Sequence, residues 1–291
     1  MIKVQHLTKQ YNRDVHALRG VDLEIGTGMF GLVGPNGAGK TTLMRILAGL
    51  VKPTDGRIHI FNHDLTTSKG KQAVKAQLGY LPQEFGFYPD LTAVQFLDYI
   101  GILKGIRSKT DRQRQVTQVL EQVRLSDVGG RKIKTFSGGM KRRVGIAQAL
   151  LGSPKLLIVD EPTAGLDPEE RVRLRNLLAD TASRCTVILS THIVEDISQS
   201  CNDLAVMQKG QVLFRGSPRD LITAARGKVW QIVTQGERPN GHTAVVSTLQ
   251  LQDGVQFRVL GDPDPKYEAR PAEPSLEDGY MWLMSQNPSA H

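Results

Sequence analysis

Two kinds of hydrophobic pattern occupy the first fifty or so residues. Apolar side chains alternate with polar ones at Leu18, Val21, Leu23 and Ile25, which predicts a strand with one buried face, and IKVQHL before them has the same character. The next apolar run, MFGLV, predicts a fully buried strand. A glycine-rich turn then leads into TTLMRILAGL, a predicted helix that ends at Gly49. RIHIF and QLGYLPQ predict further strands.

The pattern changes to helical spacing between about residues 89 and 151, which predicts a helical insertion. Two segments carry this spacing, LTAVQFLDYIGILKGI and DRQRQVTQVLEQVRL. Their apolar positions are Leu91, Val94, Leu97, Ile102, Val116, Val119, Leu120 and Val123.

Alternating strand and helix patterns return after the insertion. KLLIVD and TVILSTH are continuously apolar, as expected of parallel strands covered on both faces, and PEERVRLRNLLADTA between them predicts a helix. DLAVMQKGQVLFRG predicts a hairpin that turns at Lys209 and Gly210.

The composition shifts again after about residue 225. KVWQIVTQ and GVQFRVL predict strands, whereas GDPDPKYEARPAEP lacks periodicity and predicts a polar linker. SLEDGYMWLMS predicts a terminal helix that Ser275 caps, with Asp278 in its first turn. Gly279 weakens this helix by roughly 1 kcal/mol relative to alanine, so the helix needs a docking surface. Its apolar face comprises Leu276, Tyr280, Leu283 and Met284.

Composition and charge narrow the class of protein only slightly. The 291 residues are 40% hydrophobic and 23% charged, which is typical of a globular chain, and the formal net charge is +8. A basic balance suits an anionic neighbour, but it equally suits a well-solvated surface. Two cysteines, Cys185 and Cys201, form no metal motif, and we expect a reduced, cytoplasmic protein without a secretory signal or membrane span.

The glycine-rich turn matches the complete P-loop pattern between a predicted strand and a predicted helix. In that motif backbone N–H groups surround phosphates, Lys40 reaches the β- and γ-phosphates, and the Thr41 hydroxyl binds Mg²⁺. The motif consists of Gly34, Pro35, Asn36, Gly37, Ala38, Gly39, Lys40 and Thr41, with Thr42 directly after it.

A pair of carboxylates ends the apolar run KLLIVDE. A buried carboxylate is costly unless a positive charge meets it, so Asp160 is expected to hold Mg²⁺. Glu161 is placed to act as the general base for an attacking water. Such a run ending in Asp-Glu is weak evidence alone and gains its weight from the preceding P-loop.

The segment TFSGGMKRR resembles a second anion-binding turn, about a hundred residues after the first. Ser137 could simply cap the helix that follows it. However, the segment has no Gly-Lys pair followed by a hydroxyl, so it is not an independent nucleotide loop.

These motifs, in this order, resemble the nucleotide-binding subunits of ABC transporters from residue 1 to about 225. Ser137, Gly138 and Gly139 resemble the family's signature motif, although Phe136 and Met140 replace its usual leucine and glutamine. Further matches are Tyr11 with the adenine-stacking aromatic, Gln83 with the Q-loop glutamine, the segment Gly165-Leu166-Asp167 with the D-loop, and His192 with the switch histidine. Each also has a plainer interpretation: an exposed aromatic, a loop amide, a helix start before Pro168, and a strand-end histidine.

The resemblance implies a P-loop NTPase with a mixed sheet, an N-terminal antiparallel β subdomain and an inserted helical subdomain at about 84–151. It also implies a head-to-tail dimer around two ATP·Mg²⁺, in which the signature motif of one subunit binds the nucleotide held by the other. The implied catalytic residues are Glu161, His192 and Gln83, and the implied metal ligands are Thr41, Gln83 and Asp160. The partners would be a second ATPase subunit, most simply another copy of this chain, and a membrane permease that Phe85-Gly86-Phe87-Tyr88 contacts, unless that stretch only fills a hinge.

The C-terminal sequence bears on the transporter class and on the division of the chain into domains. Pro274-Ser275-Leu276-Glu277-Asp278 resembles a segment that ends many exporter ATPases with separate permeases, although a generic terminal helix would look similar. We expect an ATPase domain at 1–225, a small α+β extension at 226–291, and a location at the inner face of the membrane. Two alternatives are a soluble ABC-type ATPase acting on nucleic acid or the ribosome, which the basic charge suits, and a regulatory subunit that does not hydrolyse ATP.

Overall fold

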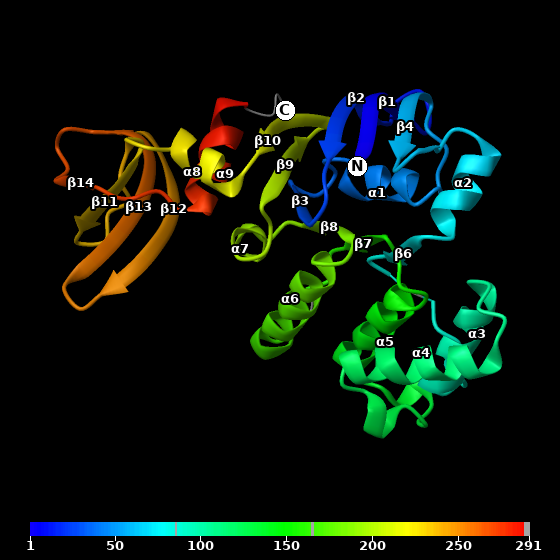
Figure 1. Ribbon diagram of the computed structural model, residues 1–291. Helices are drawn as coiled ribbons and strands as arrows, with labels where there is room; N and C mark the ends of the chain where they lie inside the picture. The colour runs from blue at the N-terminus through cyan, green and yellow to red at the C-terminus, as the bar shows by residue number, and fades with distance from the viewer. Residues whose placement is uncertain (85, 164–165, 288–291) are drawn as a thin grey trace.

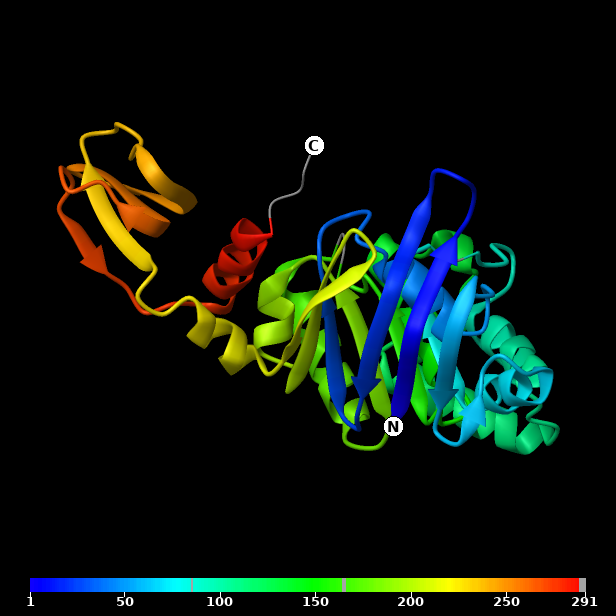
Figure 2. The ribbon, with the colours of Figure 1, turned by 90° about the horizontal axis from the view of Figure 1, so that it is seen from above.

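The structure is a computed structural model that describes residues 1–84, 86–163 and 166–287. The chain forms a central α/β body with a helical lobe at one end and a separate small sheet at the other (Figure 1). Viewed from above, the terminal helix lies between that small sheet and the central body (Figure 2). Among the described residues, no helix combines the length and the hydropathy that a membrane span requires.

The first sheet is antiparallel, in the order β2-β1-β4-β5. Its strands are β1 (Ile2–Gln10), β2 (His16–Ile25), β4 (Asp55–Ile60) and β5 (His63–Asp64). The predicted apolar face of β2 is confirmed, because Leu18, Val21, Leu23 and Ile25 are all buried. This sheet covers α1 (Lys40–Leu47) and one face of the central sheet through a shared apolar cluster.

The central sheet is mixed, in the order β10-β9-β3-β8-β7-β6. Its strands are β3 (Met29–Val33), β6 (Leu78–Leu81), β7 (Leu156–Asp160), β8 (Thr186–Thr191), β9 (Asp203–Gln208) and β10 (Gln211–Gly216). The first five run parallel, and β10 returns antiparallel through the predicted hairpin turn, where Lys209 and Gly210 have positive φ. Every residue of β7 and β8 is buried, because helices or the first sheet cover both faces.

Further helices of the described chain either flank the central body or form the helical lobe (Figure 1). Two belong to its flanks, α2 (Ser68–Lys75) and α6 (Pro168–Ala182), and α7 (Val194–Ser198) follows β8. The predicted helical insertion is confirmed as α3 (Ala93–Leu103), α4 (Lys109–Gln122) and α5 (Gly138–Leu150), with the short 3₁₀ turns η1 (Ser126–Val128) and η2 (Ile133–Thr135). The periodicity in α3 identified its buried face only partly. Leu97 is buried, but Val94 and Ile102 are 42% and 52% exposed because Ala93 and Phe96 face the core instead.

The C-terminal region forms a third sheet, antiparallel and ordered β12-β13-β11-β14, after α8 (Pro218–Ala224). Its strands are β11 (Val229–Thr234), β12 (Gly241–Leu251), β13 (Gly254–Pro263) and β14 (Ala269–Pro271). The sequence did not predict β12, and the prediction of a structureless linker at 261–274 was wrong. β13 extends into that segment and β14 pairs with β11, because an edge strand tolerates proline and needs only backbone partners.

The terminal helix α9 (Leu276–Gln286) forms as predicted, and Ser275 and Asp278 make a reciprocal capping box. Asp278 is fully buried and also accepts hydrogen bonds from Arg258 of β13, at 2.6 Å for the shortest. Burial alone would raise the pKa of Asp278, but the hydrogen bonds from Arg258 and Ser275 outweigh it and lower the pKa. This ion pair fixes the third sheet to α9.

The predicted apolar face of α9 packs on α7, α8 and the core cluster beneath them. The division of the chain at residue 225 therefore stays a prediction, since α9, assigned to the second unit, contacts helices of the first. Gly279 has a packing role: a Cβ at this position would lie 2.3 Å from the carbonyl oxygen of Leu221 in α8.

We therefore predict that Gly279→Ala lowers the free energy of unfolding, although alanine is the better helix former. Overpacking costs about 1–3 kcal/mol, which exceeds the propensity gain of about 1 kcal/mol over most of that range. Denaturant unfolding measures the difference. Ser285→Ala on the exposed side of α9 is the control, because it also gains helix propensity and loses only exposed hydrogen bonds of its hydroxyl, chiefly the one to the carbonyl oxygen of Trp282. A stabilised Gly279→Ala variant would contradict this packing.

Candidate functional site

The site lies at the carboxyl edge of the central sheet. Strands β3, β8, β7 and β6 are parallel, so their carboxyl ends meet at one edge. The P-loop follows β3, His192 follows β8, Glu161 follows β7 and Gln83 follows β6. This edge is where open α/β sheets bind ligands.

The P-loop presents the N-terminus of α1 to this edge. Gly39 is the N-cap residue in the left-handed conformation, and no side chain caps the helix, which leaves its first N–H groups pointing at the site. Only glycine fits at 39, because a Cβ would lie 2.6 Å from the carbonyl oxygen of Ala17. A helix N-terminus of this kind favours an anion.

Lys40 is almost fully buried beside that N-terminus. Its Nζ donates to the carbonyl oxygen of Gly34 at 2.6 Å and lies 3.9 Å from Glu161 Oε1. Burial lowers the pKa of Lys40, and the negative charges of Glu161 and Asp160 oppose that shift. The site therefore contains one ammonium group and two carboxylates out of water.

Asp160 has a buried carboxylate that no hydrogen-bond donor in the described part of the chain reaches. The residue is fully buried, and neither carboxylate oxygen has a hydrogen-bond partner among the described residues. A buried carboxylate is costly without a cation or donors, so this position fits a divalent ion. Mg²⁺ is usually bound by one or two carboxylates together with phosphates and waters, so a single buried carboxylate such as Asp160 suits it.

Glu161 is held in an unusual backbone conformation. Its φ is +49°, which is left-handed, and its N–H donates to the carbonyl oxygen of Ser190 at 3.0 Å. Its Oε2 lies 2.7 Å from Nδ1 of His192, whose side chain is 52% exposed. The buried carboxylate and the exposed imidazole thus form one hydrogen-bonded pair at the edge of the sheet.

A pocket of about 530 Å³ opens at this edge; Lys40 and Glu161 line it, whereas Asp160 and His192 are not among its lining residues. Tyr11 and Gln83 line it together with the P-loop residues from Asn36 to Thr42 and with Glu161, as expected for a nucleotide site. Tyr11 is 52% exposed, so a face of its ring is available for stacking. Three further residues line the pocket, Val15, His16 and Ala17. The sequence did not predict them, because they belong to a turn and a strand start without a motif.

The signature segment is not part of this pocket. Ser137 caps α5 by accepting a hydrogen bond from Met140 N at 3.2 Å, and Ser137 and Gly138 are exposed to solvent. Asp167 is likewise exposed and caps α6, accepting from Glu170 N at 2.8 Å, while Gly165 lies outside the described residues. The structure confirms the plainer capping roles of Ser137 and Asp167 and leaves both residues free to meet a second molecule.

The two departures from the usual signature sequence are apolar contacts. Phe136 is 5% exposed, and Met140 packs against the same core cluster. They anchor α5 in the helical lobe, so the substitutions leave the exposed Ser137 and Gly138 and the partly exposed Gly139 unchanged.

Comparisons with known proteins agree with this geometry. The sequence profile of the ABC transporter family matches residues 18–164. An ABC transporter ATP-binding protein of Synechocystis is 34% identical over 93% of this chain and 79% of its own length. The Nod factor export ATP-binding protein I of Cupriavidus metallidurans is 36% identical over 97% of both chains. A dimeric ATP-binding cassette bound to ADP and Pi superposes with a TM-score of 0.69 and 27% identity, covering 75% of this chain and 98% of the other.

The chain therefore belongs to the ABC transporter family, and its fold is that of the family's ATP-binding cassettes. This confirms the predicted family and fold class, and it supports the transporter ATP-binding subunit over the nucleic-acid alternative. The roles of individual residues stay predictions.

We predict that Lys40→Ala abolishes detectable nucleotide binding. The change removes a buried donor and leaves Asp160 and Glu161 to repel phosphate, a loss of about 2–5 kcal/mol by analogy with other buried charge pairs. Titration calorimetry with ATP measures the effect, and Lys52→Ala, at an exposed lysine, is the control. Retained tight binding would show that the P-loop is not the nucleotide site.

Proposed function

We propose that this protein binds and hydrolyses ATP as the ATPase subunit of an exporter with separate permease subunits. The observation that carries the proposal is the group of buried charges at the sheet edge. Lys40 and the N-terminus of α1 suit the phosphates, and Tyr11 suits the adenine. Because the relatives include ATP-binding proteins of export systems, the nucleotide is assigned as ATP.

Mg²⁺ would be held by Asp160, Thr41 and Gln83, and when bound it would neutralise charge on the phosphates. The unpartnered oxygens of Asp160 support this assignment. Thr41 and Gln83 line one pocket together with Glu161, the residue directly after Asp160, which supports placing the three ligands around one ion.

Glu161 would accept the proton from the water that attacks the γ-phosphate. A general base must lie within hydrogen-bond reach and be correctly oriented, and both backbone bonds and His192 restrain Glu161. His192, the exposed member of the pair, would orient Glu161 and contact the γ-phosphate.

The exposed signature segment supports a head-to-tail dimer. Ser137, Gly138 and Gly139 form a helix N-terminus suited to an anion, yet they do not line the pocket of their own chain. A second copy can bring its P-loop nucleotide to this segment, which then supplies electrostatic stabilisation in trans. One structural relative is described as a dimeric cassette in a post-hydrolysis state. Closing around ATP and opening after hydrolysis would provide the mechanical work.

The helical lobe offers a surface for a permease. Tyr88 is 54% exposed and stacks edge-on against Tyr99 at 5.6 Å, next to the exposed Val94 and Ile102 of α3. A groove of about 540 Å³ between α3 and α4 adjoins these side chains. Phe87 instead packs on Phe96 inside the lobe. Tyr88 therefore suits permease contact, whereas Phe87 suits the alternative role of filling the hinge. Phe85 lies outside the described residues. Docking to a permease here would place the protein at the inner face of the membrane.

We predict that Glu161→Gln lowers the turnover number for ATP by about 10²–10⁴-fold and leaves ATP binding intact. The glutamine keeps the shape of the side chain but cannot accept the proton. Steady-state phosphate release and ATP titration measure the two quantities, with Glu195→Gln, an exposed carboxylate nearby, as the control. Hydrolysis at the normal rate would exclude Glu161 as the base.

We also predict that Tyr88→Ala combined with Ile102→Ala weakens permease binding by at least about 2 kcal/mol, since both side chains are exposed apolar anchors. Co-purification with the permease and permease-stimulated ATPase are the measurements. Leu50→Ala, another exposed apolar residue, is the control. Unchanged assembly and stimulation would contradict this docking surface.

A further inference from the structure

Arg142 is a buried arginine one turn into α5 that the sequence motifs did not identify. Its side chain leaves the same helix face as Gly138, because residues four apart share a face. Only 8% of the residue is exposed. A guanidinium group is seldom buried without a specific set of acceptors.

Arg142 donates to carbonyl oxygens of two separate chain segments. Nη1 lies 2.9 Å from the carbonyl oxygen of Glu161 and 2.8 Å from that of Pro162, and Nη2 lies 3.4 Å from that of Gln83. Burial lowers the pKa of Arg142, and the negative charge of Glu161 opposes that shift. One side chain thus connects α5 with the segments that follow β7 and β6.

The bond to Glu161 constrains a strained residue. A left-handed non-glycine residue costs on the order of 1 kcal/mol and persists only where its surroundings fix it. Ser190 holds the N–H of Glu161 and Arg142 holds its carbonyl oxygen, so the two bonds clamp both sides of this residue. The position of the Glu161 carboxylate therefore depends on α5.

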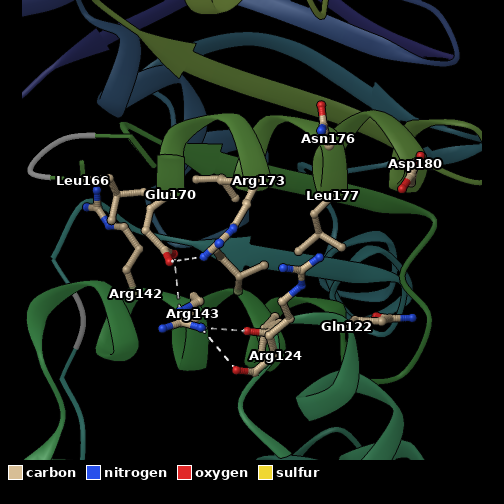
Figure 3. Close-up of a pocket in the computed structure, with 13 residues that line it drawn as sticks. Gln122, Arg124, Arg142, Arg143, Leu166, Glu170, Arg173, Asn176, Leu177 and Asp180 are labelled. Carbon is tan, nitrogen blue, oxygen red and sulfur yellow. Dashed lines mark hydrogen bonds and ion pairs between the residues drawn. The ribbon is translucent and has the colours of Figure 1, made fainter. Parts of the chain in front are cut away.

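The neighbouring Arg143 leaves α5 in another direction (Figure 3). It donates to the carbonyl oxygen of Arg124 at 3.2 Å and pairs with Glu170 of α6 at 3.4 Å. These contacts border a cavity of about 230 Å³ between α4, α5 and α6, so packing along this side of α5 is incomplete. Arg142 also lines this cavity, but its hydrogen bonds to the carbonyl oxygens of Glu161 and Gln83 connect the start of α5 with the carboxyl edge of the sheet.

We propose that Arg142 is a positioning residue that couples the two ATP sites of the dimer. This inference rests on the proposed function. Each subunit contributes Glu161 to one site and the signature segment, at the start of α5, to the other. Arg142 connects these two contributions. Its side chain restrains Glu161 in one site, and it also orients α5, whose N-terminus faces the nucleotide of the other site.

Mixed dimers test this coupling, because they leave one hydrolytic site. One subunit carries Glu161→Gln and the other keeps Glu161, and two affinity tags isolate the mixed species. In the first arrangement Arg142→Gln is in the subunit that keeps Glu161. In the second it is in the Glu161→Gln subunit, which supplies only the signature segment to the active site.

We expect kcat to fall by at least about 10-fold in both arrangements, because small displacements of reacting groups can lower the rate by up to about 10²-fold. KM for ATP should change by less than about twofold, since the P-loop is intact. Arg143→Gln, placed in the same two arrangements, should lower the melting temperature without the two-sided loss of kcat. If Arg142→Gln does not fold, Arg142→Lys keeps the charge but not the forked donors, and it should show the same two-sided pattern.

A loss confined to the first arrangement would reduce Arg142 to a local support of Glu161 and overturn the coupling. A loss confined to the second arrangement, an equal loss with Arg143→Gln, or no loss at all would overturn it as well. Failure of the proposed function is distinguishable, because the parent mixed dimer with both arginines intact would then lack ATP-dependent assembly or turnover.

Discussion

The structure depends on keeping charged groups out of water at the carboxyl edge of one sheet. Lys40, Asp160 and Glu161 are each at most 6% exposed, and Asp160 lacks a partner among the described residues. Buried charges are costly unless opposite charges and hydrogen bonds compensate them, and here the protein supplies only part of that compensation. We propose that a polyphosphate with its divalent ion supplies the rest. On this proposal, the uncompensated charge allows ligand binding at this edge to drive a change elsewhere in the protein.

The same edge accounts for the proposed division of the motifs between two molecules. Gln83, Glu161 and His192 meet because their strands are parallel neighbours, whereas Ser137 sits on a helix of the inserted lobe and faces outward. The signature segment forms the N-terminus of α5, and in the proposed dimer it would complete the nucleotide site of a second copy. Within one chain, Arg142 connects α5 with the segments that follow β7 and β6.

The sequence predicted the elements that depend on burial or on a fixed backbone geometry, but not those that depend on backbone hydrogen bonds between distant segments. Continuous apolar runs identified β7 and β8, and the P-loop pattern identified α1, because burial and a fixed backbone geometry leave strong local signals. β14 was missed because its pairing with β11 is made by backbone groups at a sheet edge, which leave no periodicity. Arg142 was missed for a similar reason: its acceptors are carbonyl oxygens far away in the sequence, and any residue could provide them.

The central claim is that the signature segment of one copy meets the P-loop nucleotide of another. Disulfide formation tests it directly, between Asn36→Cys in one chain and Ser137→Cys in a second, both carrying Glu161→Gln. Burial raises the pKa of the native thiols, to about 11 for Cys185 and about 12 for Cys201, which keeps them from competing. The account predicts a cross-linked dimer with ATP and Mg²⁺ and none with ADP. A disulfide that forms equally without nucleotide, or fails to form when ATP is bound, would contradict it.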